Sequence, residues 1–265
     1  MKISNRGFAP KNFNVEFSNV DQQGRTRMFK LSWSKINLFL KCPCCFYKEQ
    51  VFRVKRPGID PETFSLHNVI DKLWKREFDQ YREKNEPHPL MIQSHIDAVP
   101  FNCSIVEDWR NYKTGGIQYI DQEKGLVISG VIDDLWINSS GELIVVDYKT
   151  TANSNFMSCK GKLTISNQRQ LSFYAHLLKC KNFLVHDTGY FVYSKVVGDK
   201  NLFNQRLDFE SSILPYTIDD SWVEKILVDI RNCLDQSQTP EPSKYCDVCK
   251  FTFNREKQMD RAFNE

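Results

Sequence analysis

The chain has 265 residues, of which 41% are hydrophobic and 26% charged, and its 36 Lys and Arg against 33 Asp and Glu give a net charge of +3. This composition is close to the globular average and argues against a disordered, collagen-like or coiled-coil protein, while so small a net charge neither indicates nor excludes nucleic-acid binding. No apolar run approaches the roughly 18 residues of a membrane span, and the segment MKISNRGFAP has no apolar signal core, so we expect a cytoplasmic protein with no membrane partner.

The first half of the chain predicts an arm followed by two helical segments. Residues 1–30 are polar with scattered Phe, which is typical of an N-terminal arm. From residue 31, the run LSWSKINLFLKCPCCFYKEQ predicts a helix that Pro43 ends or kinks. The clearest helix covers residues 62–84, where apolar side chains recur about every 3.6 residues. Its predicted apolar face consists of Leu66, Val69, Ile70, Leu73, Trp74, Phe78 and Tyr81. His67 falls between Trp74 and Phe78 in angle, so we expect it to point inward.

The second half predicts strands with helices between and after them. IQYI, GLVISGVIDDLWIN and ELIVVDYKTT read as strands, and the last two are nearly continuous apolar runs, typical of strands buried on both faces. Residues 167–182 predict a helix. GYFVYSKVV and FNQRLDFE predict further strands, and DDSWVEKILVDIRNCL predicts the final helix. This order of elements favours an α/β protein with a mixed sheet and helices packed on it.

Two aspartates interrupt the buried strands. Desolvating an unpaired carboxylate costs several kcal/mol, so Asp133 and Asp147 each need a partner. If Ser139-Ser140-Gly141 closes a three-residue hairpin loop, Asp133 lies opposite Asp147 with the Cβ atoms about 5 Å apart. Such a pair repels unless a proton or a cation lies between the carboxylates, and Mg²⁺ or Mn²⁺ suits all-oxygen ligation. Lys149 alternates onto the face of Asp147, where it can stabilise charge developing on a phosphate.

The alternative interpretation is a salt bridge at the rim of the sheet. In it, Asp133 or Asp134 and Asp147 end their strands and pair with Lys149. A lone Asp-x-Lys is common by chance, but Gly130-x-x-Asp133, a hairpin and then Asp147-x-Lys149 on an apolar strand is a much rarer arrangement.

This arrangement resembles the PD-(D/E)xK nuclease superfamily, in particular its RecB-like branch, which includes the CRISPR-associated RecB-like exonucleases. The matching motifs occur in the family's order: His67 in SLHNVIDKL, Gly130 and Asp133 in GVIDD, Asp147-Tyr148-Lys149 in VVDYKTT, and Gln170 and Tyr174 in QRQLSFY. The resemblance implies a restriction-endonuclease-like core of order α-β-β-β-α-β with a mixed central sheet flanked by helices. It also implies a single domain over residues 31–265, with a helical part (31–115), a sheet core (116–210) and a C-terminal helix and Cys knuckle (211–265).

By the same resemblance, a metal is held by His67, Asp133, Asp147 and the backbone carbonyl of Tyr148, and Lys149 is catalytic. Gln170 and Tyr174 then contact the DNA or support the site. The implied activity is that of a Mg²⁺- or Mn²⁺-dependent deoxyribonuclease, an exonuclease acting on single-stranded DNA or duplex ends in DNA processing, repair or CRISPR-type defence, with a protein complex as a further partner. The residues alone leave two alternatives: a buried His67 satisfied by a backbone carbonyl, and Gln170 and Tyr174 as an i,i+4 pair packed on the sheet.

Five of the nine cysteines form two clusters near opposite ends of the chain: Cys42, Cys44, Cys45, Cys246 and Cys249. The odd count and the lack of a secretion signal argue against a complete disulfide framework. Cys42 and Cys45 pair with Cys246 and Cys249 as two C-x2-C motifs, which suit Zn²⁺ or an iron–sulfur cluster. Either metal would clamp the first helix to the C-terminal tail. Cys44 can replace Cys45 as the ligand.

Some RecB-like nucleases resemble this chain in tying those two segments with a [4Fe–4S] cluster. They take one cysteine from the N-terminal side and three from the C-terminal side, whereas here no cysteine follows Cys249. This departure makes zinc a second candidate.

Two rival functions remain at this point. One is a catalytically silent nucleic-acid-binding or scaffold protein that keeps the fold and the cysteine clamp. The other is a redox or metal-sensing module in which the thiols are central.

Overall fold

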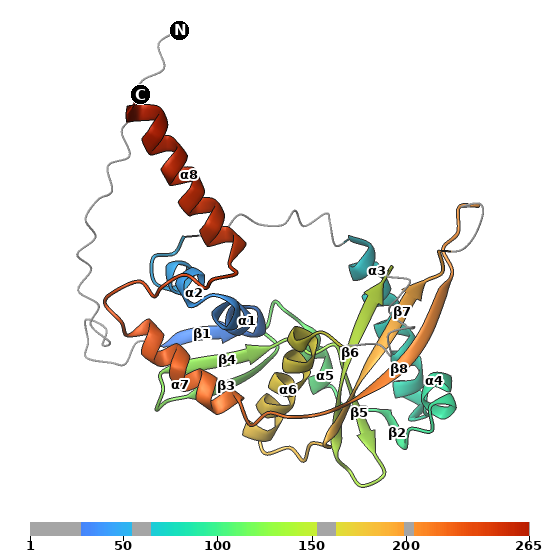
Figure 1. Cartoon of the computed structure of the whole chain (residues 1–265). Helices are drawn as coiled ribbons and strands as arrows, with labels where there is room; N and C mark the ends of the chain where they lie inside the picture. Colours follow the sequence, from blue (N-terminus) through green and yellow to red (C-terminus); the bar gives the residue numbers. More distant parts are fainter. Residues whose placement is uncertain (1–27, 55–64, 153–162, 199–203, 265) are drawn as a thin grey trace.

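The computed structural model describes residues 28–54, 65–152, 163–198 and 204–264, so most of the expected N-terminal arm lies outside the described residues. Within these ranges the chain forms two sheets and several helices around them (Figure 1). No helix in the described part combines the length and the apolar character that crossing a membrane requires. The observed architecture is a mixed α/β fold, as expected.

The larger sheet has five strands in the order β2-β5-β6-β7-β8, with β6 parallel to β7 and the other neighbours antiparallel. Its members are β2 (Ala98–Pro100), β5 (Asp134–Asn138), β6 (Leu143–Thr151), β7 (Thr188–Val196) and β8 (Phe209–Thr217). The strand predicted at FNQRLDFE is therefore placed too early, because β8 begins only at Phe209. The smaller sheet, of order β1-β4-β3, consists of β1 (Phe29–Ser32), β3 (Ile117–Asp121) and β4 (Leu126–Gly130).

The run GLVISGVIDDLWIN is not one strand but two. It leaves β4 at Gly130 in the smaller sheet and enters β5 at Asp134 in the larger one. At the crossing, Nε of Arg110 donates a hydrogen bond to the backbone carbonyl of Asp133 (3.0 Å), which replaces a ladder partner there. Both halves are apolar because both are buried, so hydrophobicity alone does not reveal the break.

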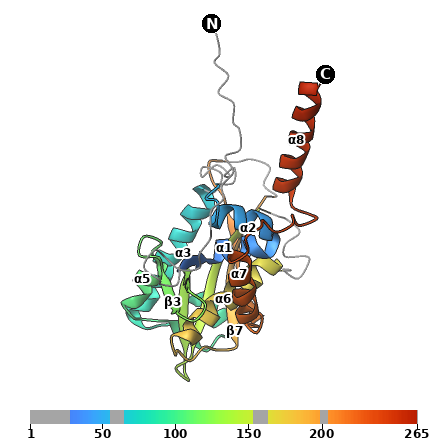
Figure 2. The same cartoon turned by 90° about the vertical axis from the view of Figure 1, so that its left-hand side faces the viewer.

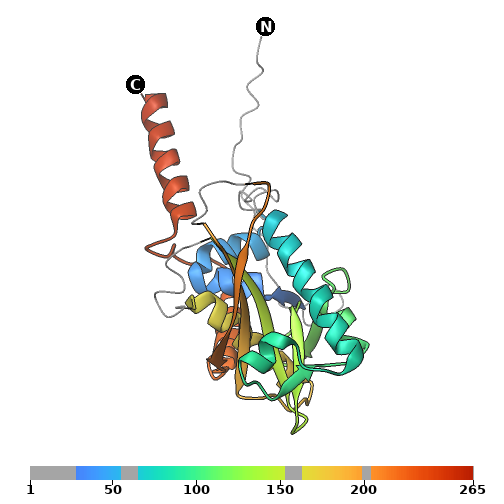
Figure 3. The same cartoon turned by 90° about the vertical axis from the view of Figure 1, so that its right-hand side faces the viewer.

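Eight helices surround the sheets among the described residues: α1 (Trp33–Lys41), α2 (Pro43–Gln50), α3 (Ser65–Lys84), α4 (Pro89–Gln93), α5 (Ile105–Arg110), α6 (Ile165–Cys180), α7 (Val223–Leu234) and α8 (Asp247–Asn264). The first predicted helix is divided as expected at Pro43, because Cys42 is extended and Pro43 opens α2. Helix α8 was not predicted. It extends away from the rest of the chain in all three views (Figures 1, 2 and 3).

Side chains of β6 are buried on both faces of the larger sheet. Leu143 and Val145 face the core shared with α1, α2, α6 and α7, whereas Ile144, Val146 and Tyr148 face the smaller core under α3. Helix α6 contacts strands of both sheets, and α3 contacts β6 and β2 (Figure 1). The segment that carries Asp147 and Lys149 is thus enclosed between two helices.

Only half of the apolar face predicted for α3 is buried. Ile70 and Phe78 are buried, but Leu66, Val69 and Leu73 are about half exposed at 47%, 52% and 53%. The predicted face spans about half of the helix circumference, which is wider than the strip that one sheet can cover. In the described part of the chain, helix α3 therefore presents an exposed apolar strip along its N-terminal half.

Candidate active site and cysteine metal centre

The hairpin between β5 and β6 has the register that the sequence predicts. Asp134 pairs with Val146, and Ile137 pairs with Leu143. Gly141 closes the loop in the left-handed region (φ +80°), and the amide of Asn138 donates to the carbonyl of Glu142 (3.2 Å). One more step along this ladder sets Asp133, the residue before β5, opposite Asp147. We call these two residues the aspartate pair.

Asp147 is fully buried on β6. Its carboxylate accepts no well-directed hydrogen bond from the described residues, although Oδ2 lies 2.5 Å from Nζ of Lys149 in an ion pair. Burial raises the pKa of Asp147 to about 7, and the negative charge of Asp133 adds to this effect while Lys149 opposes it. A buried carboxylate with unsatisfied oxygens beside a second carboxylate fits a cation site.

Asp133 is held by a lysine that sequence reasoning missed. Nζ of Lys75 on α3 lies 3.1 Å from Oδ1 of Asp133 and 2.8 Å from Oδ2 of Asp71, and the amide of Tyr148 donates to Oδ2 of Asp133 (3.3 Å). The pKa of Asp71 is raised by burial and by the charge of Asp133. The spacing His67, Asp71, Lys75 places all three on one side of α3, which was the available signal.

Asp134, adjacent to Asp133, has a different environment. It is fully buried between Arg82, whose Nη2 donates to Oδ1, and Arg110, whose Nη2 donates to the same atom (2.7 Å). The hydroxyl of Tyr148 donates to Oδ2 (2.5 Å). Burial acts to raise the pKa of Asp134, but the charges of Arg110 and Arg82 outweigh it and lower the pKa below its usual value. Asp134 therefore anchors the start of β5, and Asp133 is left to face Asp147.

Lys149 is positioned by α6. Its Nζ donates to Oε1 of Gln170 (3.5 Å), and Nε2 of Gln170 donates to the hydroxyl of Tyr174 (3.0 Å). Tyr174 is buried and packs over Gly130. Burial acts to lower the pKa of Lys149, but the charges of Asp147 and Asp133 raise it, so the ammonium form is maintained. The motif residues of β4, β6 and α6 thus form one connected group.

His67 does not point inward as expected. It is exposed in the first turn of α3, and the first buried residue of this helix is Ile70. Its angle on the helix is that of the site-facing side, but it lies about one turn beyond the covered part. Among the described residues, the structure does not bring ligand atoms of His67, Asp133 and Asp147 within 4.8 Å of one another.

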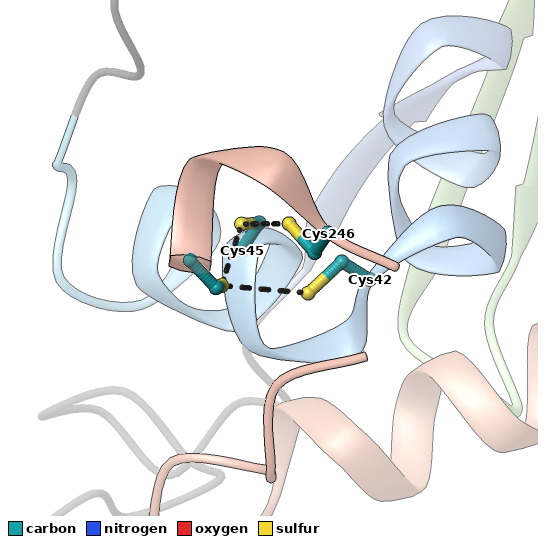
Figure 4. A group of neighbouring side chains, drawn as sticks. Cys42, Cys45 and Cys246 are labelled. Atoms are coloured by element: carbon teal, nitrogen blue, oxygen red, sulfur yellow. Dashed lines mark hydrogen bonds between the residues drawn. The ribbon is translucent and has the colours of Figure 1, made fainter. Parts of the chain in front are cut away.

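The structure gathers four cysteines from the two ends of the chain (Figure 4). The Sγ atoms of Cys42, Cys45, Cys246 and Cys249, which we call the cysteine cluster, all lie within 4.8 Å of one another. Sγ of Cys45 is 3.5 Å from that of Cys246 and 3.4 Å from that of Cys249, and the Cys42–Cys249 separation is 3.8 Å. Cys44 is buried but lies outside the cluster, so Cys45 belongs to it and Cys44 does not.

The cysteine cluster joins the break between α1 and α2 to the first turn of α8. Four sulfur atoms at about 2.3 Å from a tetrahedral Zn²⁺ are about 3.8 Å apart, which is close to the separations observed here. The pKa of Cys42 falls to about 6: burial acts to raise it, but hydrogen bonds from the Ser243 and Cys45 backbone and from neighbouring thiols outweigh burial. The donor set and its spacing fit a metal centre.

Comparison with known proteins finds one family whose model spans the parts of the chain that carry both sites. A model of the PD-(D/E)XK nuclease superfamily matches residues 30–253, which include the aspartate pair, Lys149 and the cysteine cluster. A search of curated proteins finds no match. Among solved structures, the chain is similar to one titled "Crystal structure of SSO0001", with a TM-score of 0.37 and 14% identity over 80% of this chain and 79% of that chain.

Proposed function

The chain belongs to the PD-(D/E)XK nuclease superfamily, and on this premise we propose that it is a metal-dependent DNA nuclease of the RecB-like branch. Membership indicates a nuclease-type phosphodiesterase with a nucleic-acid substrate and a divalent metal. The observation that carries the proposal is the placement of Asp147, buried without a well-directed hydrogen bond, opposite Asp133 and beside Lys149. We propose that residues 31–265 form one nuclease domain.

Asp133 and Asp147 are the proposed ligands of Mg²⁺ or Mn²⁺, because both ions prefer carboxylate oxygen. His67, which lies on the side of α3 that carries Asp71 and Lys75, and the carbonyl of Tyr148 are proposed to complete the set. When bound, the cation supplies a Lewis acid and a water of lowered pKa.

Lys149 is the proposed catalytic cation. Its ammonium group would stabilise the charge that develops on the phosphate in the transition state. Gln170 orients that ammonium group through the hydrogen bond at 3.5 Å, and Tyr174 holds Gln170 in turn. Gln170 is partly exposed and is also proposed to contact the DNA, whereas Tyr174 is buried and is proposed to support the site.

The activity is tested by incubating the protein with single-stranded, linear duplex and circular DNA in the presence of Mn²⁺ or Mg²⁺. We expect degradation of the substrates with free ends, an exonuclease pattern, and loss of activity in Asp147→Asn. Equal cleavage by the wild type and Lys149→Ala would overturn the assignment of Lys149. Binding of DNA without cleavage in any divalent metal would favour the silent scaffold.

The cysteine cluster is proposed to hold Zn²⁺ or a [4Fe–4S] cluster as a structural clamp, and the short separations between its sulfur atoms favour Zn²⁺. Its role is to fix α8 against α2, two segments about 200 residues apart whose loop closure is entropically costly. A role in DNA processing, repair or CRISPR-type defence, within a protein complex, remains part of the proposal and rests on the resemblance to RecB-like nucleases.

A further inference from the structure

We propose that Lys75 is a built-in counter-ion of Asp133 that competes with the divalent cation and thereby sets the metal affinity of the site. This inference rests on the proposed function, because it concerns the metal that Asp133 and Asp147 would bind. It assigns a positioning role to a residue on α3 outside the motifs that the family resemblance matches.

The contacts of Lys75 point to this role. Its Nζ bridges two carboxylates, at 3.1 Å from Asp133 and 2.8 Å from Asp71, and its side chain is only 20% exposed. Lys75 is therefore a charged ammonium group held against one half of the aspartate pair.

The helix that carries Lys75 is fixed at this turn. The indole Nε1 of Trp74 donates to Oγ of Ser194 on β7 (2.6 Å), and its ring stacks on Tyr148 at a centroid separation of 6.3 Å. Because Trp74 is anchored to the sheet, its neighbour Lys75 stays within reach of Asp133. The contact between Lys75 and Asp133 thus results from the packing of α3 on the sheet, unlike an ion pair between flexible side chains on the surface.

Two ammonium groups face the three carboxylates in and beside the aspartate pair. Lys149 pairs with Asp147, and Lys75 pairs with Asp133, while Asp71 adds one further negative charge. A divalent cation held by Asp133 and Asp147 would be repelled by both ammonium groups. Removing the charge at position 75 is therefore expected to strengthen metal binding by about tenfold, which corresponds to about 1.4 kcal/mol.

The test is titration calorimetry of the whole protein with Mn²⁺ alone, in the absence of DNA. The heat of Mn²⁺ binding that is absent in the Asp133→Asn variant is assigned to the site at the aspartate pair. We expect Lys75→Met to bind Mn²⁺ about tenfold more tightly than the wild type and Lys75→Arg, which keeps the charge, to stay within about twofold of it. Lys72→Met is the matched control, because Lys72 is exposed on the same helix, and its affinity should equal that of the wild type.

A second measurement, the melting temperature with and without Mn²⁺, tests the inference even if the Lys75→Met variant is less stable. Without Lys75, Asp71 and Asp133 repel each other, so the melting temperature in chelator should fall, and the rise on adding Mn²⁺ should exceed that of the wild type. Unchanged or weaker Mn²⁺ binding by Lys75→Met, with Asp133-dependent binding in the wild type, overturns this inference and leaves the proposed function standing. Lack of Asp133-dependent Mn²⁺ binding in both proteins overturns both.

Discussion

Tyr174 packs over Gly130 so closely that a Cβ atom at position 130 would lie 2.8 Å from ring atoms Cδ1 and Cε1 of Tyr174. The same tyrosine accepts the hydrogen bond of Gln170, which in turn accepts one from Lys149. The glycine at the end of β4 therefore determines where the proposed catalytic lysine is held, although it lies on a different sheet.

Gly130→Ala should lower the free energy of unfolding by about 1–3 kcal/mol, because the added methyl group overpacks a buried ring. Nuclease activity should fall as well, because displaced Tyr174 no longer orients Gln170. Gly198→Ala is the matched control, since among the described residues nothing lies within 4 Å of a Cβ there. Denaturant unfolding and a DNA-degradation assay measure both effects, and a fully active Gly130→Ala would contradict this account.

Lys149→Ala should reduce kcat/KM for DNA by on the order of a hundredfold or more, because it removes the charge expected to stabilise the transition state. Gln170→Ala should have a smaller effect, about tenfold, because it loosens Lys149 without removing it. Lys225→Ala on the exposed face of α7 should leave the rate unchanged. A larger loss in Gln170→Ala than in Lys149→Ala would reverse these roles.

Substitutions of the adjacent residues Asp133 and Asp134 should have different effects: one mainly on activity and the other mainly on stability. Asp134→Asn removes the fully buried carboxylate that Arg82 and Arg110 share and leaves both paired with the partly exposed Asp79, so it should cost about 3 kcal/mol in unfolding free energy. Asp133→Asn should abolish metal-dependent cleavage with a much smaller stability cost, because Asp133 is partly exposed at 22%. Equilibrium unfolding of the two variants under one set of conditions measures the stability costs. An equal or larger cost for Asp133→Asn would contradict the prediction.

The same network predicts an acid dependence of stability. The pKa of Asp134 is lower in the folded protein than in the unfolded chain, so the unfolded state binds the proton first as the pH falls. The stabilisation from Asp134 is then complete above the unfolded pKa of about 4 and is lost as the pH falls through the folded value. Unfolding free energies between neutral and acid pH should fall less steeply for Asp134→Asn than for the wild type.

The sequence predicted the aspartate pair well for a physical reason. Alternation along a strand and a glycine that can close the loop define which residues face each other, so Asp133 and Asp147 follow from local rules. The crossing between Gly130 and Asp134 did not follow, because it depends on Arg110 from a distant helix. Nor did Lys75, whose role depends on how α3 packs.

Helix α3 also shows what the sequence alone does not reveal. Periodicity identified the helix, but it does not show how wide a strip the sheet covers, so Leu66 and Leu73 were expected inside and are exposed. His67 was expected to point inward but is exposed for a related reason: whether a position near the start of the helix is covered depends on where the sheet ends.

The cysteine cluster provides the last prediction. Purified protein should contain a single metal ion per chain at this site, and the sulfur separations of 3.4–3.8 Å favour colourless Zn²⁺ over a coloured iron–sulfur cluster. Cys45→Ala should lose this metal, whereas Cys44→Ala, at a neighbouring buried position outside the cluster, should keep it. Metal analysis and visible absorbance measure both outcomes.

Loss of the metal should release α8 without destroying the aspartate pair, because the cluster lies at the α2–α8 junction and Asp147 lies on β6. Cys45→Ala should therefore melt at a lower temperature and be cleaved faster by protease at the junction before α8, while residual Mn²⁺-dependent cleavage persists below that melting temperature. If Cys45→Ala lost all cleavage while remaining folded, the cluster would have to act in the chemistry or in DNA binding. If Cys44→Ala lost the metal instead, Cys44 would be the ligand.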